Sequence, residues 1–164
     1  MTVEIIVRVI VLGIGATLVM DLWALLRRRC FGIASLDYAL VGRWLGHMRH
    51  GRFHHPAIGK VQPVRGERLL GWSCHYLIGV IFAALFVAVI GPQWLGQPTL
   101  VPALLLGAVS VSAPLLLMQP AFGMGLAASR TPHPWQVRLR SLVTHMVFGV
   151  GIYLTALVTS LVCE

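Results

Sequence analysis

Four polar side chains stand out in this sequence because each lies within a long apolar segment. They are Asp21, His75, Gln119 and His145. A carboxylate and two imidazoles can bind ions, exchange protons near neutral pH or ligate a metal, and an amide can hydrogen-bond a polar solute. Because a polar group inside a bilayer is costly, about 2.5–3.5 kcal/mol for Asp at the centre of a helix, we expect the four side chains to face one another.

Three hypotheses follow for this set. In the first, Asp21 and His145 form a charged or proton-coupled pair that His75 and Gln119 complete, at an inner-leaflet site for a small solute, ion or lipid. In the second, His75 and His145 lie near haem or quinone in a redox or lipid-modifying membrane enzyme, with both imidazoles as axial haem ligands. In the third, the four residues are interhelical hydrogen-bond partners of a structural membrane subunit, at roughly 0.5–2 kcal/mol per bond.

The sequence favours the first hypothesis, a non-enzymatic protein without a cofactor, and leaves the other two open. It contains no phosphate loop, dinucleotide fingerprint, nucleophile elbow or HExxH motif.

A second group of chemically capable residues lies between the first two apolar segments. Four histidines fall within nine residues, namely His47, His50, His54 and His55. Their spacing fits no standard zinc pattern, and no acidic residue lies nearby to balance the charge of a metal. They are weak metal candidates.

Cationic residues of the same loop are better suited to a phosphate or a lipid head group. The candidates for this contact are Arg49, Arg52, His54 and Lys60. Glu67 is the one acid near the second apolar segment, and we expect it to pair with Arg65 or Arg68.

Four apolar segments must position these residues. They cover residues 5–26, 69–91, 99–122 and 141–162. At about 1.5 Å per residue, each can cross a hydrocarbon core of about 30 Å as a helix. A content of 57% hydrophobic and 11% charged residues excludes a soluble domain. The sequence therefore predicts an all-α protein with four transmembrane helices, in a single membrane domain over residues 1–164.

The distribution of charge predicts the orientation. Nine of the 13 Lys and Arg residues lie in the loop 27–68 and three in the loop 123–140. Because cationic loops stay in the cytoplasm, we expect both loops there and both termini in the periplasm of a bacterial inner membrane. The net charge of +8 then reflects topology and not nucleic-acid binding. The expected partners are the lipid bilayer and a second copy or a larger complex, since four short helices are few for a transporter.

Local patterns add three expectations. Leu40, Val41 and Trp44 recur at helical spacing in the first loop, with Arg43 on the opposite arc, which predicts an amphipathic helix lying in the interface or packed on the bundle. Pro114 and the residues after it predict that the third helix is kinked or broken. Small residues such as Gly13, Gly107 and Gly149 predict close helix packing.

An internal repeat is visible at an offset of 70 residues. Arg68, His75 and Gly79 recur as Arg138, His145 and Gly149. This indicates two copies of a two-helix unit in the same orientation, an arrangement that places ligand sites between the copies in some transporters.

Several stretches along nearly the whole chain carry a resemblance. They are 13–23, 38–44 with Gly46-His47, 51–53, Gly66-Glu67, Gly71-Trp72, 75–79, 118–120, 127–132 and 138–142 with His145. Together they resemble a bacterial family of small membrane proteins known as domain of unknown function 2938. The resemblance implies a four-helix inner-membrane protein and brings no known activity, substrate or cofactor.

Overall fold

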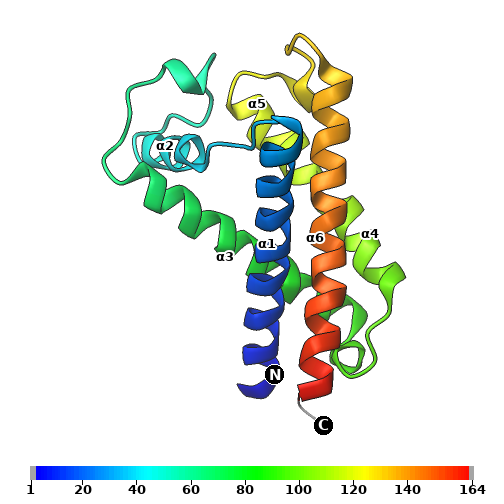
Figure 1. The fold of residues 1–164 in the computed structure, drawn as a ribbon. Coiled ribbons are helices and arrows are strands. Elements are labelled where there is room, and N and C mark those ends of the chain that lie inside the picture. Colours follow the sequence, from blue (N-terminus) through cyan, green and yellow to red (C-terminus); the bar gives the residue numbers. More distant parts are fainter. Residues whose placement is uncertain (1–2, 163–164) are drawn as a thin grey trace. The chain divides into compact units, whose positions relative to one another are not determined.

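The structure, a computed structural model, describes residues 3–162. Its regular elements in this range are all helices, and four are long and apolar enough to cross a membrane (Figure 1). These spans are Val3–Phe31, Glu67–Ile90, Leu100–Ala121 and Pro134–Leu161. The predicted all-α fold with four such helices is confirmed. The chain ends predicted to be periplasmic, residues 1–2 and 163–164, lie outside the described residues.

Three of the four spans are continuous helices, and the third is interrupted. The continuous helices are α1 (Val3–Phe31), α3 (Glu67–Ile90) and α6 (Pro134–Val162). The third span consists of α4 (Leu100–Ser110), the π-helical η3 (Pro114–Met118) and α5 (Gln119–Ala121). The helix expected in the first loop is α2 (Tyr38–Met48). Short 3₁₀ turns complete the chain at η1 (Ile58–Lys60), η2 (Pro92–Leu95) and η4 (Leu126–Ala128).

Several helix ends differ from the predicted ones. Helix α1 continues through Arg27–Arg29 to Phe31, past the predicted end at residue 26. The charges end the apolar run but not the helix, because arginine is a good helix former and cations are favourable at a helix C-terminus. Helix α6 begins at Pro134 and not at residue 141, and proline suits a first helical position. Helix α3 ends at Ile90 because Gly91 has a φ of +100°.

The chain divides into two compact units. Unit 1 contains the described parts of Met1–Ser35, Tyr76–Ser110 and Thr144–Glu164, and unit 2 contains Leu36–His75 and Val111–Val143. Helices α3 and α6 each contribute one part to each unit.

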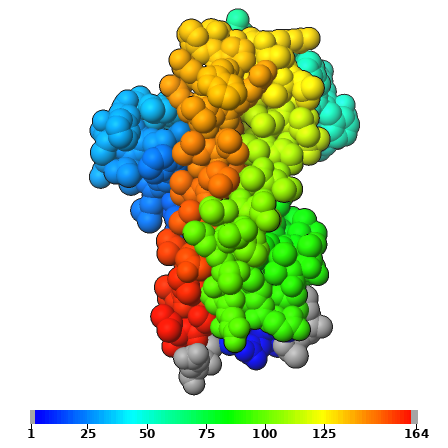
Figure 2. Space-filling view, turned by 90° about the vertical axis from the view of Figure 1, so that its right-hand side faces the viewer, coloured from blue at the N-terminus to red at the C-terminus, as the bar shows by residue number. Residues whose placement is uncertain are grey.

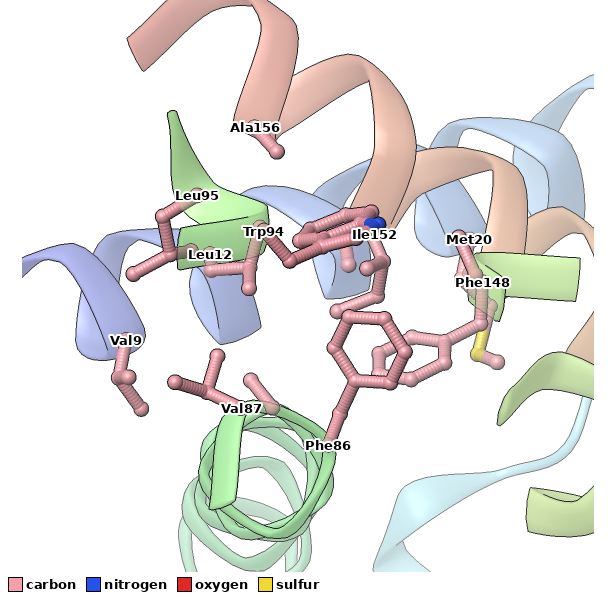
Figure 3. Packing of buried hydrophobic residues seen from close by; sticks show 13 residues of the cluster. Val9, Leu12, Met20, Phe86, Val87, Trp94, Leu95, Phe148, Ile152 and Ala156 are labelled. Carbon is pink, nitrogen blue, oxygen red and sulfur yellow. The ribbon is translucent and has the colours of Figure 1, made fainter. Parts of the chain in front are cut away.

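The core of unit 1 is an apolar cluster from α1, α3, η2, α4 and α6 (Figure 3). Leu12 and Ile152 are almost fully buried in it. Phe86 meets Trp94 edge to face, with ring centroids 4.7 Å apart. Such aromatic pairs add about 0.5–1.5 kcal/mol beyond the area they bury.

Glycines bring the helices of unit 1 into backbone contact, as the small residues of the sequence predicted. A Cβ atom on Gly13 would lie within 3 Å of the backbone of Val80, and Gly79 faces the side chain of Thr17. Gly107 and Gly149 join α4 to α6 in the same way, and Figure 2 shows these helices side by side. Because lipid gives helices no hydrophobic reason to associate, such close contact is what holds a membrane bundle together.

Unit 2 is built around the crossing of α2 and α3. A Cβ atom on Gly42 would collide with the Glu67 carbonyl, and one on Gly71 would collide with the Tyr38 carbonyl. An apolar cluster that includes Val41, Ile58 and Phe122 lies next to this crossing. Helix α2 therefore packs its glycine face directly on the first turns of α3 (Figure 1).

Candidate functional site

The third span carries a π-helical turn and a strained segment after it in unit 2. Pro114 has no N–H to donate, and the chain accommodates it as the π-helical turn η3. After α5, Ala127 and Ala128 adopt positive φ values of 48° and 59°. Each such residue costs roughly 1–3 kcal/mol, and backbone strain of this kind clusters at functional sites. Irregular backbone at membrane depth is tolerated only where protein buries it or where it lines a cavity.

The strained turn is held from α6. The Nε of Arg138 donates a hydrogen bond of 2.7 Å to the carbonyl oxygen of Ala127. Thr131 adds a second support, since its hydroxyl donates to the carbonyl oxygen of Ala128 at 2.7 Å. The backbone of this segment is thus fixed by side chains and not by regular helix bonds.

Gln119 lies where the π-helical turn meets α5. It is 2% exposed. Its Nε2 donates to the hydroxyl of Ser141 on α6 over 3.4 Å, while its Oε1 has no partner among the described residues. A buried polar atom without a partner costs about 1–3 kcal/mol, so this one calls for an explanation.

His55 contributes a second unpartnered atom to unit 2. The loop that carries it is bonded to the end of α5, because the backbone N–H of His55 donates to Ala121 at 2.8 Å and that of Ile58 donates to Phe122 at 3.2 Å. The His55 side chain is 5% exposed, and its Nε2 has no partner within residues 3–162.

The electrostatics of His55 follow from this position. Burial lowers the pKa of His55 below its usual value, and the neighbouring His47, His54 and Arg52 lower it further. A hydrogen bond to the backbone of Arg52 acts in the opposite direction, which identifies the ring as the donor in that bond. Because Nε2 is the unpartnered nitrogen, the proton lies on Nδ1 and Nε2 presents a lone pair.

His75 belongs to an aromatic cluster at the crossing of α2 and α3. Its Nε2 lies 3.0 Å from the hydroxyl of Tyr38, and the two rings stack with centroids 4.1 Å apart. Trp72 contacts both rings, at 4.5 Å from Tyr38 and 5.8 Å from His75. This residue of the predicted set therefore connects two helices of unit 2.

Asp21 and His145 both lie in unit 1. The hydroxyl of Tyr76 donates to Oδ2 of Asp21 at 2.9 Å, from α3 to α1. The hydroxyl of Ser110 lies 2.8 Å from Nδ1 of His145 and donates its one hydrogen to the Gly107 carbonyl at 2.9 Å. Nδ1 of His145 is then the donor toward Ser110.

Each of the four predicted residues is therefore bonded to a hydroxyl group on another helix. The hydroxyls belong to Tyr76, Tyr38, Ser141 and Ser110. A hydroxyl can rotate to donate or to accept, so it remains a partner when the group beside it gains or loses a proton. Asp21 and His145 lie in one unit and His75 and Gln119 in the other, and their convergence on one site stays a prediction.

The chain also matches a known protein family. The model of the family described as Protein of unknown function (DUF2938) matches residues 10–159. The chain belongs to this family. No curated protein and no solved structure matches the chain. The DUF2938 match covers Asp21, His55, His75, Gln119 and His145.

In this DUF2938 chain, the histidines and cations of the first loop differ in how deeply they are buried. Arg49, Arg52, His54 and Lys60 are exposed, as a head-group contact requires, whereas His55 is buried. Within residues 3–162, no group of three or more His, Cys, Asp or Glu side chains is arranged to hold a metal ion.

Sequence reasoning missed the ion pair that anchors α2. Arg43 was placed on the arc opposite the apolar residues, but it is only 9% exposed and donates to both carboxylate oxygens of Glu67, at 2.7 and 2.9 Å. It also donates to the carbonyl of Val61 at 3.0 Å. The expected pairing of Glu67 with Arg65 or Arg68 is wrong. Hydrogen bonding to Glu67 raises the pKa of Arg43.

A signal for this pairing exists in the sequence. Gly42 and Gly46 flank Arg43, and both face close neighbours, Glu67 and Val64 respectively. Glycines on one side of a short helix indicate the side on which another chain segment approaches closely. An arginine next to this face is a candidate for burial, and a buried arginine is usually paired with a carboxylate.

Proposed function

We propose that this chain is a multi-pass inner-membrane protein, and not an enzyme, that binds or moves a small solute or ion at the broken third span. The observation that carries the proposal is Gln119, a fully buried amide with one unpartnered end at the junction of a π-helical turn and a short helix. The π-helical turn lies inside a span that is otherwise helical from Leu100 to Ala121, and π-helical turns occur frequently at functional sites.

The chemistry of the unpartnered atoms defines the ligand class. The Oε1 of Gln119 accepts hydrogen bonds, and the neutral His55 presents a lone pair on Nε2. The segments that carry Gln119 and His55 are joined by the His55–Ala121 hydrogen bond. Two hydrogen-bond acceptors on these segments favour a ligand that donates hydrogen bonds or carries positive charge. A small ammonium-type cation or a polar neutral solute meets this requirement.

The structural-subunit hypothesis has its own support, since every one of the four predicted residues bridges two helices through a hydroxyl. It does not account for Gln119. A side chain kept only to join α5 to α6 would have its hydrogen-bonding groups satisfied, because an unsatisfied one cancels most of what the bond contributes. The polar atom without a partner therefore favours ligand binding over structural bridging.

The proposal also includes an orientation in the membrane and an internal repeat. We place the two basic loops in the cytoplasm on the charge distribution of the sequence. The proposed repeat of two-helix units is supported by two matching contacts. Gly79 packs on α1 beside Gly13, and Gly149 packs on α4 beside Ala103.

The test measures ligand-induced stabilisation of the purified protein in neutral-lipid nanodiscs. Ammonium, methylammonium, sodium and potassium chlorides serve as probes, and thermal unfolding is the measurement, because a ligand that binds only the folded state raises the Tm. We expect one of the nitrogen cations to raise the Tm of the wild type and of the control Gln136→Leu, an exposed amide on α6, but not that of Gln119→Leu.

Two outcomes would count against the proposal. If all probes shift the wild type and Gln119→Leu equally, Gln119 does not take part in binding. If no probe shifts any of the proteins and Gln119→Leu unfolds at a much lower temperature than Gln136→Leu, the structural-subunit hypothesis holds.

A further inference from the structure

A hollow of about 260 Å³ opens on unit 2 where α2 ends. One wall is the end of α2 with the turn that follows it, including His47, Arg49 and His50, and the other is the segment 62–65, including Gln62 and Arg65. Two arginines and two histidines line the hollow, and its lining contains no acidic residue. This hollow is separate from Gln119 and does not rest on the function proposed above.

Hydrogen bonds hold the two walls in place and orient their donors. Nε2 of His47 lies 3.1 Å from the carbonyl oxygen of Gln62 and donates to it, which joins the walls. Nε of Arg49 donates to Nε2 of His50 at 3.2 Å. This bond leaves the two terminal amino groups of Arg49 for a further contact.

The positive charge of the hollow is not neutralised by the nearest acid. Glu67 lies two residues beyond Arg65, but Arg43 engages both of its oxygens at 2.7 and 2.9 Å. The backbone N–H of Val64 donates to one of the same oxygens at 2.9 Å. With Glu67 committed to this buried pair, the exposed guanidinium groups of Arg49 and Arg65 are open to an anion from outside the chain.

We infer that this hollow binds a phosphate group that carries two negative charges, either as free phosphate or as the head group of a phosphomonoester lipid. A guanidinium group matches two phosphate oxygens with two parallel hydrogen bonds, and two arginines on opposite walls can engage different oxygens. The volume fits one phosphate group with its bonded water. Phe53, four residues beyond Arg49 and 62% exposed, is an apolar side chain suited to contact with acyl chains.

The experiment compares two sources of the phosphate group on the full-length protein. In one arm, inorganic phosphate is titrated by calorimetry into the protein in phosphatidylcholine nanodiscs. In the other, native mass spectrometry measures retention of phosphatidic acid by protein released from mixed bilayers. The variant is Arg49→Gln with Arg65→Gln, and the matched control is Arg28→Gln with Arg29→Gln, two exposed arginines of α1.

We expect the Arg49/Arg65 double variant to weaken the binding about tenfold or more, and the Arg28/Arg29 control to leave it within about twofold. Loss in the first arm identifies free phosphate as a ligand, and loss only in the second identifies the lipid head group. The single variant Arg49→Lys keeps the charge but loses the paired donors, so we expect it to weaken binding by a smaller factor.

Two results would overturn the inference. One is absence of binding in both arms by wild-type protein whose circular dichroism shows a folded helical chain. The other is equal weakening by the Arg49/Arg65 and Arg28/Arg29 variants, which would indicate non-specific attraction by surface charge.

Discussion

Arg43 on α2 and Glu67, the first residue of α3, form a paired ion contact with both carboxylate oxygens engaged, at 2.7 and 2.9 Å. The two residues are 24 positions apart in the sequence, and their side chains are only 11% and 15% exposed. The same guanidinium reaches the loop carbonyl of Val61 at 3.0 Å. One side chain thus fixes α2, the loop after it and the start of α3 relative to one another.

Removing one member of this pair should destabilise unit 2 strongly. We expect Arg43→Met to lower the free energy of unfolding by about 3–5 kcal/mol, because it leaves the Glu67 carboxylate buried without a counter-charge. The double variant Arg43→Met with Glu67→Leu should recover much of this loss. Chemical denaturation of the four proteins in a double-mutant cycle measures the coupling. Additive losses would show that the pair is too well solvated to matter.

The glycine crossing of α2 and α3 gives a second prediction. Gly71→Ala places a methyl group against the Tyr38 carbonyl and forces the helices apart, so we expect a loss of about 1–3 kcal/mol in unfolding free energy. Gly59→Ala is the matched control, since open space surrounds Gly59 and its φ is not positive. Thermal unfolding of both variants gives the comparison. A Gly71→Ala protein as stable as Gly59→Ala would contradict the close crossing.

The spans could be predicted from sequence because the requirement they meet is local. A bilayer demands a continuous apolar stretch of fixed length, and that stretch is visible without knowledge of any contact. The irregularity after Ser110 was equally readable, since Pro114 lies in the interior of the apolar run, where a proline removes a helix hydrogen bond. The helix ends were harder to predict, because Arg27–Arg29 end the apolar run while the helix continues to Phe31.

The buried polar contacts could not be predicted because they depend on distant segments. Arg43 looked exposed by its place on an amphipathic helix, and only the approach of α3 buries it. His55 resembled its exposed neighbour His54 in sequence, and its burial follows from backbone bonds to α5. Gln119 was identified from its apolar surroundings, but its unpartnered oxygen is a property of the folded chain.

The unpartnered oxygen of Gln119 predicts that an apolar replacement stabilises the ligand-free protein. Gln119→Leu removes a buried acceptor that costs about 1–3 kcal/mol unpaired, and it loses one long hydrogen bond to Ser141 worth about 0.5–1.5 kcal/mol. We expect a net gain of about 1 kcal/mol in the free energy of unfolding, measured by denaturant titration in ligand-free buffer. The exposed control Gln136→Leu should change by less than about 0.5 kcal/mol. If Gln119→Leu instead lowered the free energy of unfolding by more than about 0.5 kcal/mol, Oε1 of Gln119 would have a hydrogen-bond partner in solution.

The burial of His55 makes the stability of unit 2 sensitive to acid. The pKa of His55 is lowered in the folded protein, first by burial and then by His47, His54 and Arg52, whereas the unfolded chain titrates near pH 6.5. Between these two pKa values the unfolded chain binds more protons than the folded one, so stability falls as the pH falls. The contribution of neutral His55 is therefore complete above about pH 6.5, decreases below it and levels off under the folded pKa. We expect thermal unfolding from pH 7.5 to 5 to show this decrease in the wild type and in the exposed control His133→Asn, with a smaller slope in His55→Asn. Equal slopes in all three proteins would show that the pKa of His55 is the same in the folded and the unfolded protein.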